Sequence, residues 1–222
     1  MLGLFDSGRG GLNTVKYVKE LADDVDLVYL IDRENAPYGI KTEKELIRIT
    51  EANINKLTDM GAERVLIACC TASTVYQKLG DRYKKLSLPI VDAVAKEAKK
   101  ATRIGRIGVI ATNRTVNSHA FKNALNNYYV TELAAPILVD LIDNGLSDEY
   151  VNADKEKMLE DMMRTVLESK IDTLILGCTH FPALIKTVSR IASRYGIDSV
   201  VDSARVGAKL LIETGRSTSK NT

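Results

Sequence analysis

The chain has 222 residues, 45% of them hydrophobic, which is enough to bury the core of one ordinary domain or of two compact lobes. Its 31 Lys and Arg residues nearly balance 29 Asp and Glu residues and are scattered, so the composition does not favour a nucleic-acid partner. No segment approaches the roughly 20 apolar residues of a membrane span, and the N-terminus does not have the pattern of a signal peptide. We therefore expect no membrane association and a cytoplasmic location.

Taken in chain order, short runs rich in Val, Ile and Leu predict strands, and longer amphipathic stretches between them predict helices. The predicted strands cover residues 2–5, 27–31, 65–68, 89–91, 107–111, 173–177 and 199–202. The predicted helices cover residues 12–21, 44–60, 93–102, 118–126, 155–170 and 182–195. This alternation predicts an α/β fold with mostly parallel sheets flanked by helices. The tail 215–222 has no apolar face and is expected to be frayed.

An internal repeat relates the two halves of the chain. The segment 65–71 matches 173–179 position by position around a Cys, and 3–7 resembles 108–112, each a strand that runs into a turn with a hydroxyl. The intervals agree, because 62 residues separate the first hydroxyl, Ser7, from Cys69, and 66 separate Thr112 from Cys178. The repeat predicts two pseudo-symmetric lobes, each presenting one thiol.

The repeat also predicts where a ligand would bind. Ligands of open α/β sheets bind at the carboxyl ends of the strands, where both thiols are expected. The active site is therefore expected in the cleft between the lobes.

The chain contains three cysteines, two of them adjacent as Cys69 and Cys70. An odd number with no second pair at ligand spacing argues against a disulfide framework and against a metal site. In a reducing compartment these are free thiols, and for any single Cys the simplest interpretation is a small buried hydrophobe.

Two loops carry features suited to binding. The first, Asp6 to Gly11, is rich in glycine between a strand and a helix, so its backbone can approach an anionic ligand. Its spacing does not match a dinucleotide-binding turn, and a plain tight turn is the alternative. The second, Asn35 to Gly39, is a rigid loop with Pro37 and Gly39 beside Tyr38.

Both thiols of the repeat precede helices, where unpaired backbone N–H groups favour thiolate over thiol. A nucleophilic cysteine enzyme needs only one thiol, whereas inverting a stereocentre needs two acid/base groups on opposite faces of the substrate. Because a free thiol has a pKa of about 8.5, a neighbouring group must help to move protons, and Asp6 and His180 are the candidates. His119 has no motif around it and is expected on the surface of a helix.

Four motifs in order now carry a resemblance that spans the chain. They are Phe5-Asp6-Ser7-Gly8-x-Gly10-Gly11, Pro37-Tyr38-Gly39, Ile67-Ala68-Cys69-x-Thr71-Ala72 and Leu176-Gly177-Cys178-Thr179-His180-x-Pro182. Together they resemble the signature of glutamate racemases, within the aspartate/glutamate racemase superfamily. The Asp6-Ser7 form of the first turn favours glutamate over aspartate.

This resemblance implies a racemase that uses no cofactor and no metal, with the site between two α/β lobes. It implies a first lobe of residues 1–92 plus 197–222 and a second lobe of residues 93–196 inserted between them. Carried over position by position, it implies acid/base roles for Cys69 and Cys178, with Asp6 assisting the first and His180 and Asp143 the second. It implies substrate contacts from Ser7, Pro37, Tyr38, Gly39, Cys70, Thr71, Thr112, Thr115 and Thr179. It also implies a homodimer that supplies D-glutamate for peptidoglycan.

Two residues depart from the family pattern. Cys70 stands where the family has Asn, so a strong hydrogen-bond donor is replaced by a weak one. Asp143 stands where the family has Glu, which shortens the side chain by one methylene. These departures leave two alternatives open: a racemase for aspartate or another amino acid, and an amino-acid-binding relative without turnover.

Overall fold

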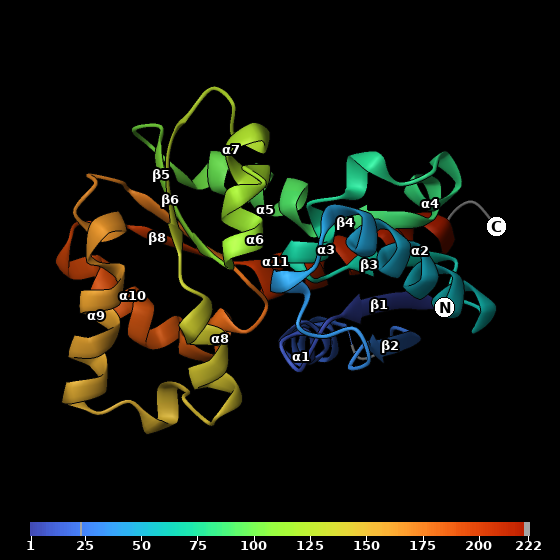
Figure 1. Ribbon diagram of the computed structural model, residues 1–222, viewed down its shortest axis with the longest axis horizontal. Coiled ribbons are helices and arrows are strands. Elements are labelled where there is room, and N and C mark those ends of the chain that lie inside the picture. Colours follow the sequence, from blue (N-terminus) through green and yellow to red (C-terminus); the bar gives the residue numbers. More distant parts are fainter. Residues whose placement is uncertain (23, 220–222) are drawn as a thin grey trace.

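The computed structural model describes residues 1–22 and 24–219, which form two parallel four-stranded sheets (Figure 1). The first sheet, in the order β2-β1-β3-β4, contains β1 (Leu2–Asp6), β2 (Leu27–Ile31), β3 (Arg64–Ile67) and β4 (Ser87–Pro89). The second, in the order β6-β5-β7-β8, contains β5 (Arg106–Ala111), β6 (Tyr129–Ala134), β7 (Thr173–Gly177) and β8 (Ser199–Asp202). The predicted two-lobed α/β fold is confirmed.

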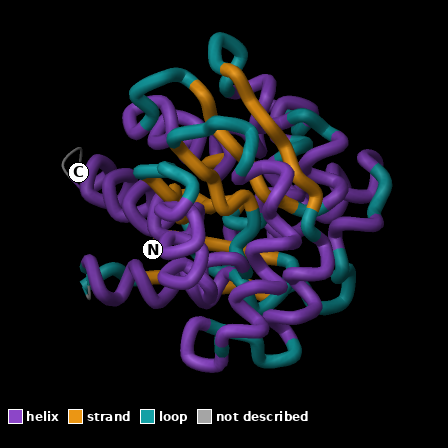
Figure 2. Tube along the Cα trace, turned by 90° about the vertical axis from the view of Figure 1, so that its left-hand side faces the viewer, coloured by secondary structure: helices purple, strands orange, loops and turns teal. Residues whose placement is uncertain are grey.

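Helices surround the strands, which lie toward the middle of the molecule (Figure 2). The longer helices are α1 (Gly11–Leu21), α2 (Glu43–Asp59), α5 (Ile90–Ala101), α8 (Pro136–Asp143), α9 (Ala153–Leu167), α10 (Ile185–Arg194) and α11 (Ser203–Ser219). The shorter ones are α3 (Cys70–Ser73), α4 (Asp81–Leu86), α6 (Asn113–Asn117) and α7 (Ala120–Ala124). Single 3-10 turns are η1 (Tyr38–Ile40), η2 (Tyr76–Lys78), η3 (Asp148–Tyr150) and η4 (Phe181–Leu184).

The strand registers relate the two sheets by sequence position. Leu2 pairs with Arg64 in the first sheet, and Ile107 pairs with Thr173 in the second. Counting five residues onward from each of these pairs, Ser7 corresponds to Cys69 in the first lobe, and Thr112 corresponds to Cys178 in the second. The residue-by-residue match of 65–71 with 173–179 would instead place Cys70 opposite Cys178. The sheet register shifts that match by one residue and makes Cys69 the counterpart of Cys178.

The expected division of the chain differs from the pairing at one strand. β8 pairs in parallel with β7, so residues 199–202 belong to the second sheet and not to the first. The chain returns to the first lobe with α11, which packs on α1, α5 and β3. One buried cluster includes residues of both sheets and of α5, which contacts α11 as well as β7 and β8, so the lobes share part of their core.

Several predicted boundaries were wrong for physical reasons. The strand expected at 89–91 ends at Pro89, because Ile90 and Val91 bury their side chains in the first turn of α5. The helix expected at 118–126 is interrupted at His119, whose φ of 53° is left-handed and incompatible with a continuous helix. The tail 215–222 was expected to be frayed, but residues 215–219 continue α11. Residues 220–222 lie outside the described residues.

One strand was missed altogether. β6 has two polar residues, Thr131 and Glu132, in its middle and forms the edge of the second sheet, with a mostly half-buried pattern. The strand search relied on continuous apolar runs, which are typical of central strands covered on both faces. The exposed face of an edge strand lacks that pattern.

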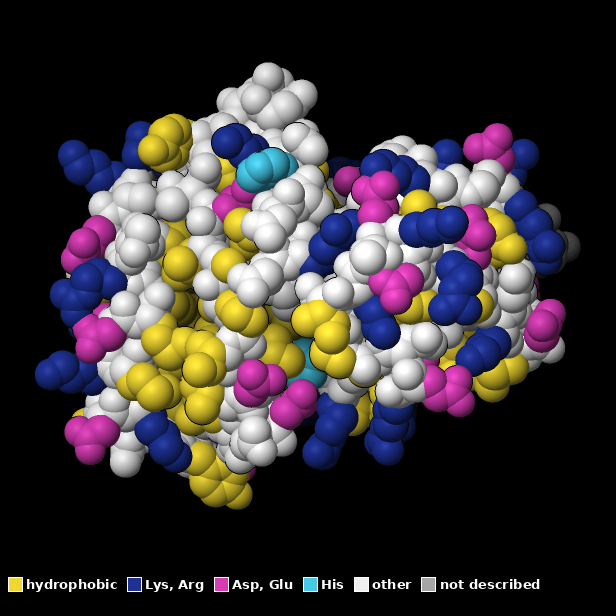
Figure 3. Space-filling model, in the orientation of Figure 1, with side chains coloured by type: hydrophobic (Ala, Val, Ile, Leu, Met, Phe, Trp, Pro, Cys, Tyr) yellow, Lys and Arg dark blue, Asp and Glu magenta, His cyan; other side chains and the backbone are white. Residues whose placement is uncertain are grey.

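The surface carries basic and acidic side chains interspersed over the face seen in Figure 3. Hydrophobic side chains gather on the same face over α8 and α9. Among the helices of the described residues, none is both long enough and apolar enough to cross a membrane.

Candidate active site

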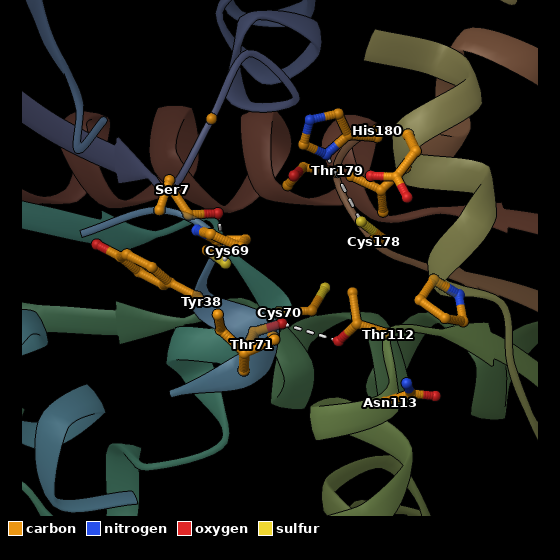
Figure 4. A pocket seen from close by; sticks show the side chains of 18 of the residues that line it. Ser7, Tyr38, Cys69, Cys70, Thr71, Thr112, Asn113, Cys178, Thr179 and His180 are labelled. Atoms are coloured by element: carbon orange, nitrogen blue, oxygen red, sulfur yellow. Dashed lines mark hydrogen bonds between the residues drawn. The ribbon is translucent and has the colours of Figure 1, made fainter. Parts of the chain in front are cut away.

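A cavity of about 360 Å³ lies where the carboxyl ends of β1, β3, β5 and β7 face one another (Figure 4). Twelve of the predicted site residues line it, and they come from both lobes: Ser7, Pro37, Tyr38, Gly39, Cys69, Cys70, Thr71, Thr112, Asp143, Cys178, Thr179 and His180. Two predicted residues, Asp6 and Thr115, do not line it and are fully buried behind it. The tertiary fold therefore gathers motifs that are up to 173 residues apart in sequence.

The first thiol stands between the end of β3 and the start of α3. Cys69 is 6% exposed, and its Sγ lies 3.5 Å from the Ser7 hydroxyl oxygen. Burial, reinforced by the charge of Asp6, raises the pKa of Cys69 to about 11, although N–H groups of α3 act in the opposite direction. The helix start thus favours thiolate as expected from the sequence, but desolvation outweighs it.

The second thiol faces the cavity from the opposite side (Figure 4). Cys178 is 7% exposed, and burial raises its pKa well above the ordinary range of a thiol. Its Sγ lies 3.7 Å from Nδ1 of His180, whose Nε2 lies 3.3 Å from Oδ1 of Asp143. The shorter Asp143 side chain therefore still reaches His180, and the three residues form a continuous chain of titratable groups.

Asp6 lies between the two half-sites, at the end of β1. Its Oδ1 accepts a hydrogen bond from the Gly8 N–H at 3.0 Å, and its Oδ2 accepts one from the Thr179 hydroxyl at 2.9 Å. Burial raises the pKa of Asp6, while His180 and these two hydrogen bonds lower it. Its charge raises the pKa of both Cys69 and Cys178, so Asp6 acts on both thiols and not on Cys69 alone.

Three threonine hydroxyls, one from the first lobe and two from the second, lie close together beside the cavity. Thr71 lies 3.0 Å from Thr112 and 3.3 Å from Thr115, and Thr112 lies 3.0 Å from Thr115. Thr115 is fully buried, so it contacts the other two hydroxyls and not the cavity. Thr115 was predicted to contact the substrate directly, but it lies behind Thr71 and Thr112.

The third thiol, Cys70, also lines the cavity and is 2% exposed. Burial raises the pKa of Cys70 well above its ordinary value, and the neighbouring thiols Cys178 and Cys69 add to this effect. Figure 4 places it on the same short helix as Thr71, between Cys69 and Thr112. The raised pKa favours the thiol form of Cys70 over the thiolate.

Tyr38 is held by a polar network that sequence reasoning missed. Its hydroxyl donates to Oδ2 of Asp32 at 2.6 Å, and Nδ2 of Asn53 donates to both groups at 2.9 and 2.8 Å. Although burial alone would raise it, hydrogen bonds from Tyr38, Asn53 and Asn35 lower the pKa of Asp32. The network anchors η1 at the rim of the cavity. No sequence motif indicated this network, because its members come from separate elements.

Several lining residues were not predicted. They are Gly8, Ala36, Ile40, Asn113, Pro136, Val139 and Asp140. Asp140 precedes Asp143 by three residues on one face of α8, so helical spacing could have indicated it, whereas Asn113 only follows Thr112 directly and no such signal marks it. None of the described lining residues is Lys or Arg, so an anionic ligand would be held here by hydroxyls, amides and backbone N–H groups.

Comparison with known proteins is consistent with this arrangement. The family model for Asp/Glu/hydantoin racemase matches residues 13–211. Glutamate racemase of Aquifex aeolicus is 34% identical over 213 residues, covering 95% of this chain and 81% of that protein.

Solved structures agree over the same length. Glutamate racemase isoform RacE1 of Bacillus anthracis superimposes with a TM-score of 0.85 at 26% identity, over 98% of this chain and 82% of that one. Escherichia coli glutamate racemase, solved with L-glutamate, superimposes with a TM-score of 0.72 at 27% identity, over 96% and 82%. The chain thus belongs to the Asp/Glu/hydantoin racemase family.

Proposed function

We propose that this protein interconverts L- and D-glutamate by moving one Cα proton between two thiols. The observation that carries the proposal is the position of Cys69 and Cys178, which occupy equivalent ends of β3 and β7 and face one cavity from opposite sides. One thiolate removes the Cα proton from one face of the substrate, and the other thiol returns a proton to the opposite face. The relatives named glutamate racemase support glutamate as the substrate.

The neighbours of each thiol supply its acid/base partners. The Ser7 hydroxyl contacts Cys69, His180 and Asp143 extend from Cys178, and Asp6 acts on both through its charge. Because burial holds protons on both thiols, one proton must leave to a neighbour when the substrate binds. After one turnover the thiol and thiolate have exchanged places, so the enzyme is ready for the opposite enantiomer.

Neutral polar groups, donating to carboxylates and accepting from the ammonium group, would hold the substrate. We assign carboxylate and ammonium contacts to the side chains of Ser7, Cys70, Thr71, Thr112 and Thr179 and to the loop of Pro37, Tyr38 and Gly39. Thr115 supports two of these hydroxyls from behind. Hydrogen bonds to a charged group contribute about 1.5–3 kcal/mol each, so several of them offset the absence of Lys or Arg from the described lining.

The cellular role follows from this chemistry. D-Glutamate made by the enzyme would enter peptidoglycan, and the required free thiols favour a reducing compartment such as the cytoplasm. We also propose a homodimer, because Ile137 of α8 and Tyr150 of η3 are large hydrophobic residues that are 55% and 64% exposed. Sedimentation velocity at several protein concentrations tests the dimer.

Isotope exchange tests the proposed reaction. L- and D-glutamate are incubated separately with the protein in deuterated buffer, and loss of the Cα–H resonance is followed together with optical rotation. We expect both enantiomers to exchange and to reach a racemic mixture. Faster turnover of aspartate or another amino acid would replace glutamate as the substrate. If calorimetry shows that glutamate binds but no acidic amino acid exchanges its Cα proton, the protein is an amino-acid-binding protein and not a racemase.

A further inference from the structure

Asn13 connects the first lobe to the turn that carries the second thiol. It lies on α1, and its Nδ2 donates a hydrogen bond at 2.8 Å to the main-chain oxygen of Thr179. Thr179 stands between Cys178 and His180 at the end of β7. A side chain of one lobe therefore holds the backbone on which the acid/base pair of the other lobe is built.

This contact belongs to a junction packed without free space. A Cβ atom added at Gly10 would lie 2.5 Å from the Thr179 hydroxyl, 2.6 Å from Nδ1 of His180 and 2.8 Å from its main-chain nitrogen. The Thr179 hydroxyl also donates to Asp6 across the same junction. The turn 178–180 thus packs tightly against the glycine turn of the first lobe. Asn13 donates to the main-chain oxygen of Thr179, which lies between the side chains of Cys178 and His180 in the sequence.

We propose that Asn13 is a positioning residue that fixes Cys178 and His180 relative to Cys69. The proposal rests on the proposed two-thiol function. Asn13 does not line the cavity, so it acts through the turn and not on the substrate. Losing its hydrogen bond would loosen the Cys178 half-site and leave the Cys69–Ser7 half-site in place, so the effect on proton transfer is one-sided.

The one-sided effect has a kinetic signature. The two enantiomers have equal free energies in water, so kcat/KM must fall by the same factor in both directions. The primary isotope effects measured with the two enantiomers, in contrast, are free to differ from each other. When the substrate is deuterated at Cα, the enantiomer deprotonated by Cys178 should show a larger primary isotope effect, because that step becomes more rate-limiting. The enantiomer deprotonated by Cys69 should show a smaller one, because reprotonation by Cys178 then limits the rate.

The experiment compares Asn13→Ala and Asn13→Asp with Asn55→Ala in the otherwise unchanged protein. Asn55 is a matched control because its Nδ2 donates to the Tyr83 hydroxyl at 3.1 Å within the first lobe, away from the cavity. For both Asn13 variants we expect kcat/KM to fall roughly tenfold, as for the loss of one hydrogen bond, with KM changed less than kcat. The isotope effects of the two enantiomers should diverge. The Asn55 variant should keep wild-type isotope effects.

A second measurement does not depend on turnover. Iodoacetamide labelling followed by peptide mass spectrometry gives the alkylation rate of Cys178 relative to the Cys69–Cys70 peptide. We expect this ratio to rise severalfold in both Asn13 variants, because a loosened turn exposes Cys178. An unchanged ratio together with unchanged or equally shifted isotope effects would overturn the positioning role. If the wild-type protein exchanged no substrate proton, the proposed function would fail, and the labelling ratio alone would decide the role of Asn13.

Discussion

The hydroxyl of Thr179 donates a hydrogen bond to Asp6 across the boundary between the two lobes, at 2.9 Å and over 173 residues of sequence. Asp6 stands at the end of β1, and Thr179 follows the thiol at the end of β7. The carboxylate of one half-site is therefore completed by a hydroxyl of the other. From this position the charge of Asp6 raises the pKa of both Cys69 and Cys178.

Removing this hydroxyl should shift the pH dependence of the reaction. The bond from Thr179 lowers the pKa of Asp6, so Thr179→Val raises that pKa further. If ionised Asp6 accepts a proton during turnover, the acidic limb of the kcat/KM profile moves to higher pH, and kcat falls about 10- to 100-fold. The measurement is a pH–rate profile. Thr58→Val, at a hydroxyl that donates to Asn55 within α2, is the control and should leave the profile in place.

Replacing either thiol of the pair should stop racemisation. Cys69→Ala and Cys178→Ala each remove the acid/base group on one face, and we expect racemisation to fall by more than about a thousandfold because two such groups are needed. Cys70→Ala removes a thiol from the same cavity and should weaken substrate binding while keeping racemisation measurable. Polarimetry with both enantiomers measures the rates. Racemisation near the wild-type rate in Cys69→Ala or Cys178→Ala would contradict the two-thiol assignment.

Two buried aspartates should respond to amide substitution with opposite sign. The pKa of Asp6 is raised in the folded protein, so its ionisation destabilises the fold as pH rises through that pKa. Asp6→Asn should therefore raise Tm at pH 8 while abolishing activity, and the gain should disappear toward pH 4. Thermal melts across this pH range measure the effect.

The pKa of Asp32 is lowered, so its ionised form stabilises the fold above the unfolded pKa, and this stability is lost as pH falls through the lower folded pKa. Asp32→Asn should accordingly lower Tm by similar amounts at pH 8 and pH 4, and the loss should shrink only as pH falls below 3.8 toward the lower folded pKa. The same melts serve as the comparison for Asp6→Asn. Equal signs in the two variants at pH 8 would contradict the assigned environments.

A methyl group at Gly10 should push apart the two lobes where Gly10 meets the turn 178–180. The added carbon would meet Thr179 and the main-chain nitrogen of His180 at less than 3.0 Å, so backbone must move. We expect Gly10→Ala to cost about 1–3 kcal/mol of unfolding free energy, as other overpacked substitutions do, and to lower kcat strongly. Urea denaturation measures the cost. Gly80→Ala places its methyl 3.4 Å from Tyr83, away from the cavity, and should change stability by less than about 1 kcal/mol.

Prediction of the fold succeeded where the pattern was strong and local. The central strands β1, β3, β5 and β7 are continuous apolar runs, and each was expected within one residue of its observed bounds. The edge strand β6 and the break at His119 were not expected, because an exposed edge and one left-handed residue leave little trace in hydrophobic periodicity.

The sequence by itself determined the two-lobed α/β fold, the family and twelve of the residues around the cavity, because the motifs that carry them are short segments whose chemistry is read locally. Only the tertiary structure decided how those residues are connected. It assigned β8 to the second sheet, placed Thr115 behind the cavity, joined Asp6 to Thr179 and supplied Asp32 and Asn53 to Tyr38. It also decided that the pKa of each thiol is raised, since the cost of desolvation depends on the packing of distant segments around each sulfur.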